Sequence, residues 1–416
     1  MALHPTSPRP AADRTNAAAI VEALLTPPGR ADPYPLYARA HELGPVAAIG
    51  EGRFLISGYA AVNRMLRGPG FGMADPAGEP AANDALAALG RSILRTNPPE
   101  HGRMRSLISS VFTPRRVTGL RPAIEASVDL LLDGLSDAGT KSVPVDFMEE
   151  FAFQLPVSVI CAMLGVPQAD RHRFRSLAAD VTVALELLPD ADALGPADAA
   201  ARELADYFRA LTAERCDAPR DDLISALVAA RDKEDGRITD VELVANLVVL
   251  LVAGFETTTN LLGNGLAILF QRPELMALLR SGELPVEGFV EEVLRFDSPV
   301  QATYRVARTE GLSVEGVPVP RGSEFLLLIG AANRDPARFP DPDLFDPTRT
   351  GNAPLSFGAG AHICLGNNLA RLEAAIAFPR LLARFPRLAS AGAPTRRDRL
   401  ILRGHDTLPI IPTPRT

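Results

Sequence analysis

The longest apolar stretch of the chain, residues 239–271, most constrains its fold. It begins at Thr239-Asp240, residues favoured at helix N-termini, and ends before Pro273. A helix over this stretch would be roughly 45 Å long. Residues 244–255 are apolar around most of the circumference, so the helix must lie buried at the centre of the molecule. The most apolar part, residues 243–255, is interrupted by Asn246 and is shorter than the ~20 residues that cross a bilayer, so no membrane span is expected.

Periodicity in the rest of the chain predicts more helices and a smaller amount of strand. After Pro299, short alternating segments separated by Gly and Pro indicate strands. The Pro- and Ala-rich residues 1–19 are predicted to be a flexible tail, and no linker divides residues 20–416, which we expect to form a single domain. The predicted fold class is therefore mainly α with a minor β region. Helical spacing covers residues 117–135, 149–164, 168–187, 196–215 and 365–385.

Charge and cysteine content exclude several classes of protein. The net charge is −7, from 43 basic and 50 acidic residues, and nucleic-acid binders usually carry a basic excess. The N-terminus has no apolar signal core. The three cysteines, Cys161, Cys216 and Cys364, have neither zinc nor redox spacing, which is typical of a reducing compartment. We therefore expect a cytoplasmic protein that binds neither nucleic acid nor membrane.

A glycine-rich loop at residues 357–366 carries the strongest chemical signal. It leads into a helix, with Cys364 at the junction, where free backbone N–H groups and the positive helix end stabilise a thiolate. Glycines also let the backbone approach a bulky, flat cofactor. A thiolate on haem iron favours O–O cleavage. A phosphate-binding loop would need Lys followed by Ser or Thr where this chain has Cys364-Leu365, so that alternative is rejected.

Residues 253–258, Ala-Gly-Phe-Glu-Thr-Thr, place polar groups in the middle of the long apolar helix. A carboxylate and hydroxyls in a buried helix are costly unless they serve a function. A hydroxyl such as that of Thr257 can donate a proton to bound oxygen and be re-protonated from the side of an acid such as Glu256. In the alternative interpretation, Glu256 is solvated at a helix bend and Thr257 bonds back to its own helix.

Two further pairs of charged residues share a helix face. Glu292 and Arg295 are three residues apart, although residues 100–103 have the same Glu-x-x-Arg form. His101 and Arg105 are four apart in a helix that starts near residue 99. Arg and His suit the binding of carboxylates. The alternative for His101 and Arg105 is a basic surface helix.

The loop motif is similar to that of a known family. Phe-x-x-Gly-x-His-x-Cys-x-Gly, matched by Phe357, Gly360, His362, Cys364 and Gly366, resembles the haem-binding loop of the cytochrome P-450 superfamily. The resemblance covers nearly the whole chain and is to the soluble bacterial class. It implies a single-domain cytochrome P-450 fold with haem between the long distal helix and the helix after the Cys loop. Cys364 would be the axial ligand of the iron.

The resemblance also implies roles for the residues of the long helix and of the cofactor site. Glu256 and Thr257 would be catalytic, relaying protons to iron-bound dioxygen, aided by a local distortion at Gly254. His101, Arg105, Arg305 and His362 would bind the haem propionates. The implied cofactor-binding residues are His101, Arg105, Ala253, Gly254, Arg305, Phe357, Gly358, His362, Cys364 and Gly366, with Cys364 also the metal ligand.

A structural ion network and a set of substrate contacts complete the implied site. Glu292, Arg295 and Arg349 would form the network and support the haem loop without taking part in catalysis. The regions that would face the substrate contain few charges, so we expect a mostly apolar ligand. The expected substrate contacts are Leu250, Val300, Gln301, Thr303 and His405.

The implied cofactor is heme b, iron protoporphyrin IX, with O2 as co-substrate. The chain has no flavin or nicotinamide fingerprint, so electrons from NAD(P)H must arrive through external redox partners, a ferredoxin and a ferredoxin reductase. We expect a monomer. A basic face for an acidic ferredoxin would consist of Arg103, Arg105, Arg115, Arg116 and Arg371, and for Arg115 and Arg116 a merely solvated face is the alternative.

The predicted function is haem-dependent monooxygenation. One oxygen atom from O2 would be inserted into a large, mostly apolar small molecule, by hydroxylation or epoxidation, as a tailoring step of secondary metabolism. A steroid or terpenoid hydroxylase is an alternative, as is oxidative coupling or ring formation without oxygen insertion. A peroxygenase or a haem-based sensor would leave Glu256 and Thr257 without a role.

Overall fold

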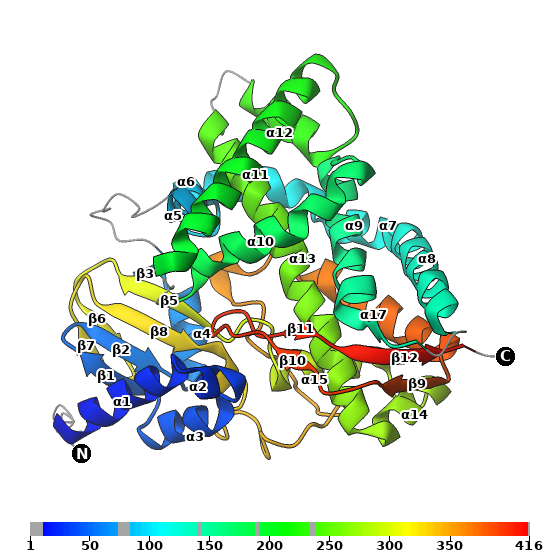
Figure 1. Ribbon diagram of the computed structural model, residues 1–416. Coiled ribbons are helices and arrows are strands. Elements are labelled where there is room, and N and C mark those ends of the chain that lie inside the picture. Colours follow the sequence, from blue (N-terminus) through cyan, green and yellow to red (C-terminus); the bar gives the residue numbers. More distant parts are fainter. Residues whose placement is uncertain (1–10, 74–83, 140–142, 188–190, 233–237, 415–416) are drawn as a thin grey trace.

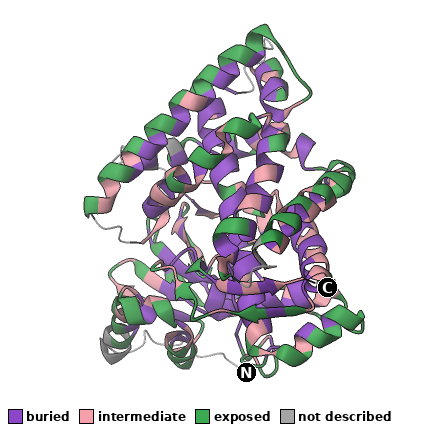
Figure 2. Cartoon of the chain, turned by 45° about the vertical axis from the view of Figure 1, so that its right-hand side comes forward, coloured by how far each residue is buried: buried purple, intermediate pink, exposed green. Residues whose placement is uncertain are grey.

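The computed structural model describes residues 11–73, 84–139, 143–187, 191–232 and 238–414. Helices make up most of this part of the chain, and a smaller region of sheet lies to one side of them (Figure 1). Buried residues run through both regions and exposed ones cover the outer faces of the peripheral helices (Figure 2). The predicted fold class, mainly α with a minor β region, is confirmed.

Seventeen α-helices are found in the described residues, together with short turns of 3₁₀-helix and one turn of π-helix at Met148–Ala152. The α-helices are α1 (Ala11–Leu24), α2 (Pro27–Ala31), α3 (Tyr34–Glu42), α4 (Tyr59–Arg67), α5 (Asp84–Gly90), α6 (Glu100–Ile108), α7 (Pro114–Gly119), α8 (Arg121–Gly139), α9 (Gln154–Leu164), α10 (Phe174–Thr182), α11 (Ala191–Asp217), α12 (Leu223–Arg231), α13 (Asp240–Gln271), α14 (Pro273–Ser281), α15 (Val286–Phe296), α16 (Ile329–Ala332) and α17 (Asn367–Arg384).

The described strands form four small sheets. The largest has the order β1-β2-β8-β5-β3, in which only β2 and β8 are parallel, and α1 lies against its β1 edge (Figure 1). The others pair β6 with β7, β10 with β11, and β12 with both β4 and β9. The strands are β1 (Val46–Gly50), β2 (Arg53–Ile56), β3 (Phe71–Gly72), β4 (Val145–Asp146), β5 (Ala302–Ala307), β6 (Leu312–Val314), β7 (Val317–Val319), β8 (Glu324–Leu328), β9 (Arg387–Ser390), β10 (Thr395–Arg396), β11 (His405–Thr407) and β12 (Pro409–Thr413).

Helix α13 is the central element, as its apolar sequence predicts. It begins with a capping box in which Thr239 and Glu242 satisfy each other's backbone N–H groups. It packs against α9, α11, α15 and α17, and its first and second halves contribute to two different apolar cores. Among the described helices it alone is long and apolar enough to cross a membrane. However, 72% of its most apolar window is buried inside the protein, as in a core helix.

The helix expected at residues 149–164 is interrupted near its start. Pro156 lacks the N–H that would bond to the carbonyl of residue 152. Just before it, the N–H of Phe153 donates to the carbonyl of Met148 at 3.0 Å, a bond of π-helix spacing. The irregularity before Pro156 takes the form of a π-turn that leads into α9.

The N-terminal region differs from its sequence-based prediction. Residues 11–19 belong to α1 instead of a flexible tail, and residues 1–10 lie outside the described residues. Ala17, Ile20 and Leu24 of α1 are buried, the last two in one apolar cluster with Tyr37. Helical spacing of these small and apolar residues was the signal for α1, and the Pro-rich composition obscured it.

Candidate active site

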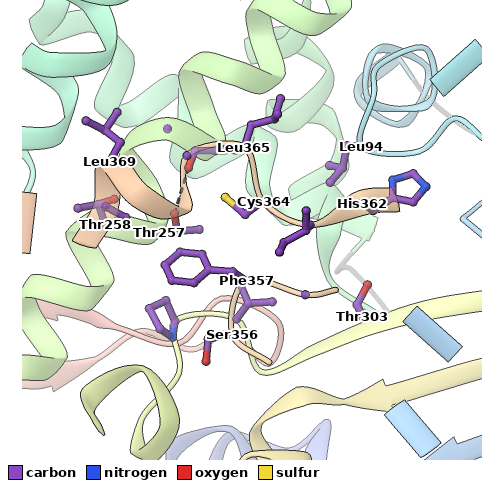
Figure 3. Close-up of a pocket in the computed structure, with 18 of the residues that line it drawn as sticks. Leu94, Thr257, Thr258, Thr303, Ser356, Phe357, His362, Cys364, Leu365 and Leu369 are labelled. Atoms are coloured by element: carbon purple, nitrogen blue, oxygen red, sulfur yellow. Dashed lines mark hydrogen bonds between the residues drawn. The ribbon is translucent and has the colours of Figure 1, made fainter. Parts of the chain in front are cut away.

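A cavity of about 280 Å³ lies between α13 and the loop before α17. Its walls are mostly apolar. Figure 3 shows Cys364 on the loop side and Thr257 and Thr258 on the α13 side of this space. Lining residues include Val249, Leu250, Ala253, Gly254, Thr257 and Thr258 of α13, Phe357, Gly358, His362, Cys364 and Gly366 of the loop, and Arg105, Val300, Thr303 and Arg305.

Positive φ angles shape the Cys364 loop. Gly358 and Gly360 have φ of 66° and 70°, a region that side chains rarely adopt. A Cβ on Gly360 would also lie 2.5 Å from the carbonyl oxygen of Leu66. The loop closes where the N–H of Cys364 donates to the carbonyl of Phe357 at 2.9 Å. Its glycines are therefore needed to hold Cys364 in contact with the cavity.

The protein alone does not favour the Cys364 thiolate. Burial raises the pKa of the thiol, while the N–H of Gly366 and the charges of Arg105 and Arg371 lower it. The predicted stabilisation by backbone N–H and positive charge is therefore present but outweighed by desolvation. A bound metal cation deprotonates a coordinating thiol outright. The donor at this position is thus chemically suited to a metal of soft character.

Four basic side chains gather at one edge of the cavity. The rings of His101 and His362 lie 4.0 Å apart between centroids, and Nε2 of His101 is buried with no hydrogen-bond partner. Burial and, to a smaller extent, the nearby His101, Arg305 and Arg105 lower the pKa of His362 to about 3. Burial also lowers the pKa of Arg305 to about 10. Such a cluster is stabilised by an anion, so these residues fit the two carboxylates of haem.

Within this cluster the arginines bond to neutral groups. Arg105 donates to the carbonyl of Ile363 at 2.6 Å, and Arg305 donates to the carbonyl of Tyr304 at 2.8 Å. His101, in contrast with Arg105, Arg305 and His362, lies behind the cavity wall. The structure thus brings together all four residues that the sequence linked to the propionates, and His101 is 2% exposed, not on a basic surface helix.

The acid and the alcohol of α13 point in different directions. Thr257 lines the cavity, and its hydroxyl donates to the carbonyl of Ala253 at 3.1 Å. The Glu256 side chain is only 6% exposed and pairs with Arg397, outside the set of cavity-lining residues. The alternative interpretation of the sequence expected Thr257 to bond back to its own helix, which is correct. It also expected Glu256 to be solvated, which is wrong, because Glu256 is buried.

The distortion expected at Gly254 is not found. Helix α13 is a continuous α-helix from Asp240 to Gln271. A Cβ at Gly254 would lie 2.6 Å from Cγ1 of Ile160 on α9. The glycine is therefore needed for the close approach of α9 to α13. Because it has no side chain, it also adds no bulk to the cavity wall at this point.

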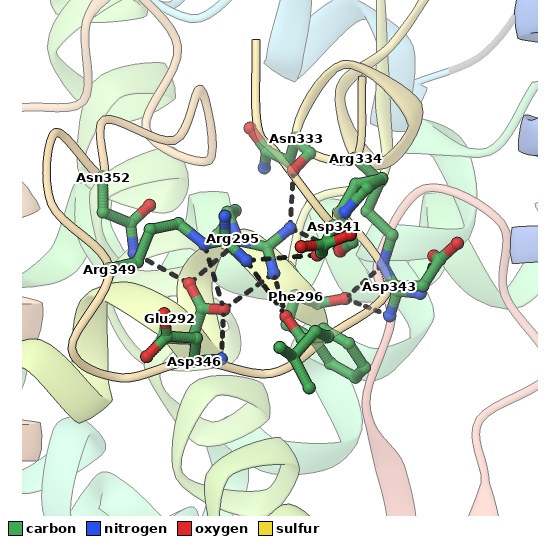
Figure 4. Close-up of polar contacts among 12 residues, drawn as sticks. Glu292, Arg295, Phe296, Asn333, Arg334, Asp341, Asp343, Asp346, Arg349 and Asn352 are labelled. Carbon is green, nitrogen blue, oxygen red and sulfur yellow. Dashed lines mark hydrogen bonds and ion pairs between the residues drawn. The ribbon is translucent and has the colours of Figure 1, made fainter. Parts of the chain in front are cut away.

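The predicted ion network forms a buried cluster beside the loop (Figure 4). Arg295 donates from Nε and Nη2 to the two carboxylate oxygens of Glu292, at 2.8 and 2.7 Å, and both side chains are fully buried. Nε of Arg349 lies 3.6 Å from Oε1 of Glu292. In the other Glu-x-x-Arg sequence, Arg103 pairs with Glu242.

Hydrogen bonds connect this network to the segment before Cys364. Arg295 donates to the carbonyl of Asn333 at 3.1 Å, and Asn333 in turn donates from Nδ2 to Oγ of Ser356 at 2.9 Å. The N–H of Leu355 donates to Oδ1 of Asn333 at 2.7 Å, and Ser356 donates to the carbonyl of Leu294 at 2.6 Å. The start of the Cys loop is therefore anchored to α15.

Of the expected substrate contacts, Leu250, Val300 and Thr303 line the cavity. Gln301 does not, because its side chain bonds to Tyr37 and to the carbonyl of Ser298. His405 does not either. It is buried on β11 against Gly263 of α13, beyond the cavity wall.

The residues of the expected basic face lie in different surroundings. Arg103 pairs with Glu242, and Arg371 pairs with Glu291 and stacks over the ring of Phe357 at 4.4 Å. Arg115 and Arg116 are exposed. At least two of the five arginines are therefore already paired with a carboxylate, Arg103 and Arg371.

Glu373 on α17 lines the cavity and was missed by the sequence analysis. Its side chain is 1% exposed, and Oε2 has no hydrogen-bond partner. Burial raises its pKa to about 8. The signal in the sequence was a single acid at helical spacing among Leu369, Ala370 and Ala377, a buried face of α17.

The buried Glu373 carboxyl should make the stability of the folded protein depend on pH. The folded protein keeps the Glu373 proton up to a pH near 8, whereas the unfolded chain releases it near 4.5, so stability should fall as pH rises between these values. Glu373→Gln removes this loss and is expected to stabilise the protein by a few kcal/mol at pH 8 and hardly at all at pH 5. Thermal unfolding at both pH values measures the effect. An unchanged pH dependence, equal to that of the exposed control Glu274→Gln, would contradict it.

Comparison with known proteins agrees with this geometry. The family model "Cytochrome P450" matches residues 45–282 and 283–403. The chain is 39% identical to cytochrome P450 monooxygenase PikC of Streptomyces venezuelae, covering 91% of each chain. It is 36% identical to 6-deoxyerythronolide B hydroxylase of Saccharopolyspora erythraea, covering 91% of this chain and 96% of that one. The ligand-free crystal structure of CYP164A2 from Mycobacterium smegmatis has a TM-score of 0.86 at 37% identity, covering 95% of this chain and 100% of that one.

Proposed function

Because the chain belongs to the cytochrome P450 family, we propose that it binds haem through Cys364 and inserts one oxygen atom from O2 into a mostly apolar small molecule. It is a cytochrome P450 monooxygenase, a class that uses haem iron, O2 and electrons from external donors. The observation that carries the proposal is the position of Cys364 and Thr257 in one apolar cavity with a basic cluster at its edge.

The residues of the site divide between holding the cofactor and assisting the reaction. Cys364 would ligate the iron, and His101, Arg105, Arg305 and His362 would bind the carboxylates of haem. Haem iron with a thiolate ligand supplies oxygen activation, because the sulfur favours O–O cleavage. Contacts to the substrate would come from Leu250, Val300 and Thr303, and the apolar wall keeps bulk water out.

Thr257 is proposed to deliver protons at the cavity. Its hydroxyl donates to Ala253 in this structure, so it must rotate away from that carbonyl to donate into the cavity. Glu256 is the adjacent acid that would restore the proton. The ion network of Glu292, Arg295 and Arg349 is proposed to hold the Cys loop in place.

Thr257→Ala should separate electron consumption from product formation. Without the hydroxyl, product formed per NAD(P)H consumed is expected to fall by about tenfold or more, in line with the loss of one proton donor. Thr257→Ser keeps the hydroxyl and should retain most of the wild-type ratio. The ratio is measured by product chromatography beside NAD(P)H oxidation. Equal ratios in Thr257→Ala and wild type would contradict the role of this hydroxyl.

For the substrate, we propose a tailoring step on a secondary metabolite, with a steroid or terpenoid as the second class. Support comes from the apolar cavity wall and from the relatives named PikC and 6-deoxyerythronolide B hydroxylase. The test is turnover with a ferredoxin, its reductase and NAD(P)H on a panel of macrolactones and steroids under ¹⁸O2. Incorporation of one ¹⁸O atom supports monooxygenation. A product that lacks the label and has lost two hydrogens would identify oxidative coupling instead.

A further inference from the structure

The hairpin formed by β10 and β11 lies along one face of α13, and Figure 1 shows these strands beside the lower half of that helix. Arg396 of β10 donates to Oδ1 of Asn264 at 3.0 Å. Gly404 lies against Asn260, since a Cβ there would be 2.0 Å from its Oδ1. Glu256, Asn260 and Asn264 are four residues apart, so they share this face. The hairpin thus covers the side of α13 that carries Glu256.

One residue of this hairpin, Arg397, lies between two carboxylates. Its Nη1 pairs with Glu256, and its Nε lies 3.1 Å from Oδ1 of Asp406. The exposed fraction of the side chain is 6% for Glu256, 18% for Arg397 and 52% for Asp406. The guanidinium therefore links a buried carboxylate next to the cavity wall with one that is in contact with solvent.

Other charges near Arg397 come from the hairpin and from α10. Burial lowers the pKa of Arg397, Asp406 raises it, and the charges of Arg399 and of Arg175 on α10 lower it. Arg175 is itself paired with Glu149. Two further cations thus repel the guanidinium, and the carboxylates of Glu256 and Asp406 offset this repulsion.

We propose that Arg397 is a positioning residue that controls proton supply by Glu256. It holds the carboxylate against the hairpin and away from the cavity, and by shifting to Asp406 it frees Glu256 to carry a proton toward Thr257. This inference rests on the proposed function, since it names the part of the chain that regulates the predicted proton relay.

The protons balance in this transfer from solvent through Glu256 and Thr257 to the cavity. Glu256 takes a proton from solvent water at the hairpin side and becomes a neutral carboxylic acid. It then gives this proton to the hydroxyl of Thr257, which has donated its own into the cavity, and returns to the carboxylate. Arg397 stays protonated throughout and pairs with Asp406 while Glu256 is neutral, so no charge is left buried without a partner.

The variant Arg397→Gln tests the proposal. Without the guanidinium, Glu256 is buried beside no cation, and its pKa should rise by about 1 to 3 units. The infrared spectrum of the holoenzyme at pH 7 should then show, beside the band of the protonated Glu373, a second protonated carboxyl band that is absent from wild type and from the Arg397→Gln/Glu256→Gln double variant. The upper limb of the pH profile for product formation should move to higher pH by the same amount.

Two controls separate this role from general stability. Arg397→Lys keeps the charge and should restore the wild-type pH profile. Arg399→Gln removes a charge from the same hairpin, but no ion pair of Arg399 with either carboxylate is found in the described residues, so it should add no carboxyl band that Glu256→Gln removes. An infrared spectrum and a pH profile that are unchanged in Arg397→Gln would overturn the proposal.

Asp406→Asn provides a second test at an exposed position, where folding is least at risk. It removes the alternative partner of Arg397, so Glu256 stays held and product formation should slow about tenfold while substrate affinity is unchanged. Turnover equal to wild type would count against the shift of Arg397.

If wild type itself forms no product with any substrate and shows no haem–thiolate spectrum, the proposed function fails. Normal wild-type turnover with an unaltered Arg397→Gln overturns this inference alone.

Discussion

Glu292→Ala is expected to destabilise the protein by about 3–5 kcal/mol, because it leaves the charge of Arg295 buried without its partner. Both side chains are fully buried, and in the described part of the chain the other acceptors of Arg295 are all carbonyl groups. The loss should also loosen the segment around Ser356, so the variant is expected to lose bound haem at denaturant concentrations that wild type withstands. Urea unfolding followed by circular dichroism, with Soret absorbance in parallel, measures both effects.

Asp343→Ala is the matched control for this prediction. Asp343 also pairs with an arginine, Arg334, but its side chain is 78% exposed. Exposed ion pairs contribute only about 0–1 kcal/mol, so the control should unfold close to wild type. If Glu292→Ala proves no less stable than Asp343→Ala, the ion network does not support the loop as proposed.

Cys364→Ala is expected to reduce product formation to background, since it removes the proposed ligand of the iron. The thiolate cannot be replaced by a methyl group, and the electron density that favours O–O cleavage is lost with it. Circular dichroism should show an intact fold, because Cys364 faces the cavity and supports no apolar core. Turnover assays with the reconstituted redox chain measure the loss.

Cys161→Ala tests whether the effect belongs to Cys364 specifically. Cys161 is buried in an apolar cluster with Leu164 and Ile160, so its replacement should cost some stability and leave turnover near wild type. Product formation by Cys364→Ala at the level of Cys161→Ala would contradict the ligand assignment.

Much of this architecture could be predicted from local sequence patterns. The apolar run of residues 243–255 is enough to place α13 at the centre, and the Thr239 cap appears where it was expected. The resemblance of the Cys loop to a known haem-binding loop implied that His362 and Cys364 serve one cofactor, and both line one cavity. Such features depend on residues close together in the chain, where periodicity and turn chemistry are informative.

Contacts between distant segments could not be predicted in this way. The partner of Glu256 is Arg397, 141 positions away on a hairpin whose register no pattern specifies. The same holds for His405, which turns toward Gly263 of α13 instead of the substrate side. The resemblance assigned Gly254 to a helix distortion. Its observed role, the close packing of Ile160 against α13, depends on the tertiary structure and leaves no signal in the local sequence.

The ferrous carbon monoxide difference spectrum of the purified protein tests the central claim most directly. It should be recorded for wild type beside Cys364→Ala and Cys161→Ala. We expect a Soret band strongly red-shifted from that of histidine-ligated haem in wild type and in Cys161→Ala, and its loss in Cys364→Ala. A globin-like spectrum in wild type, or a red-shifted band that survives in Cys364→Ala, would contradict Cys364 as the haem ligand.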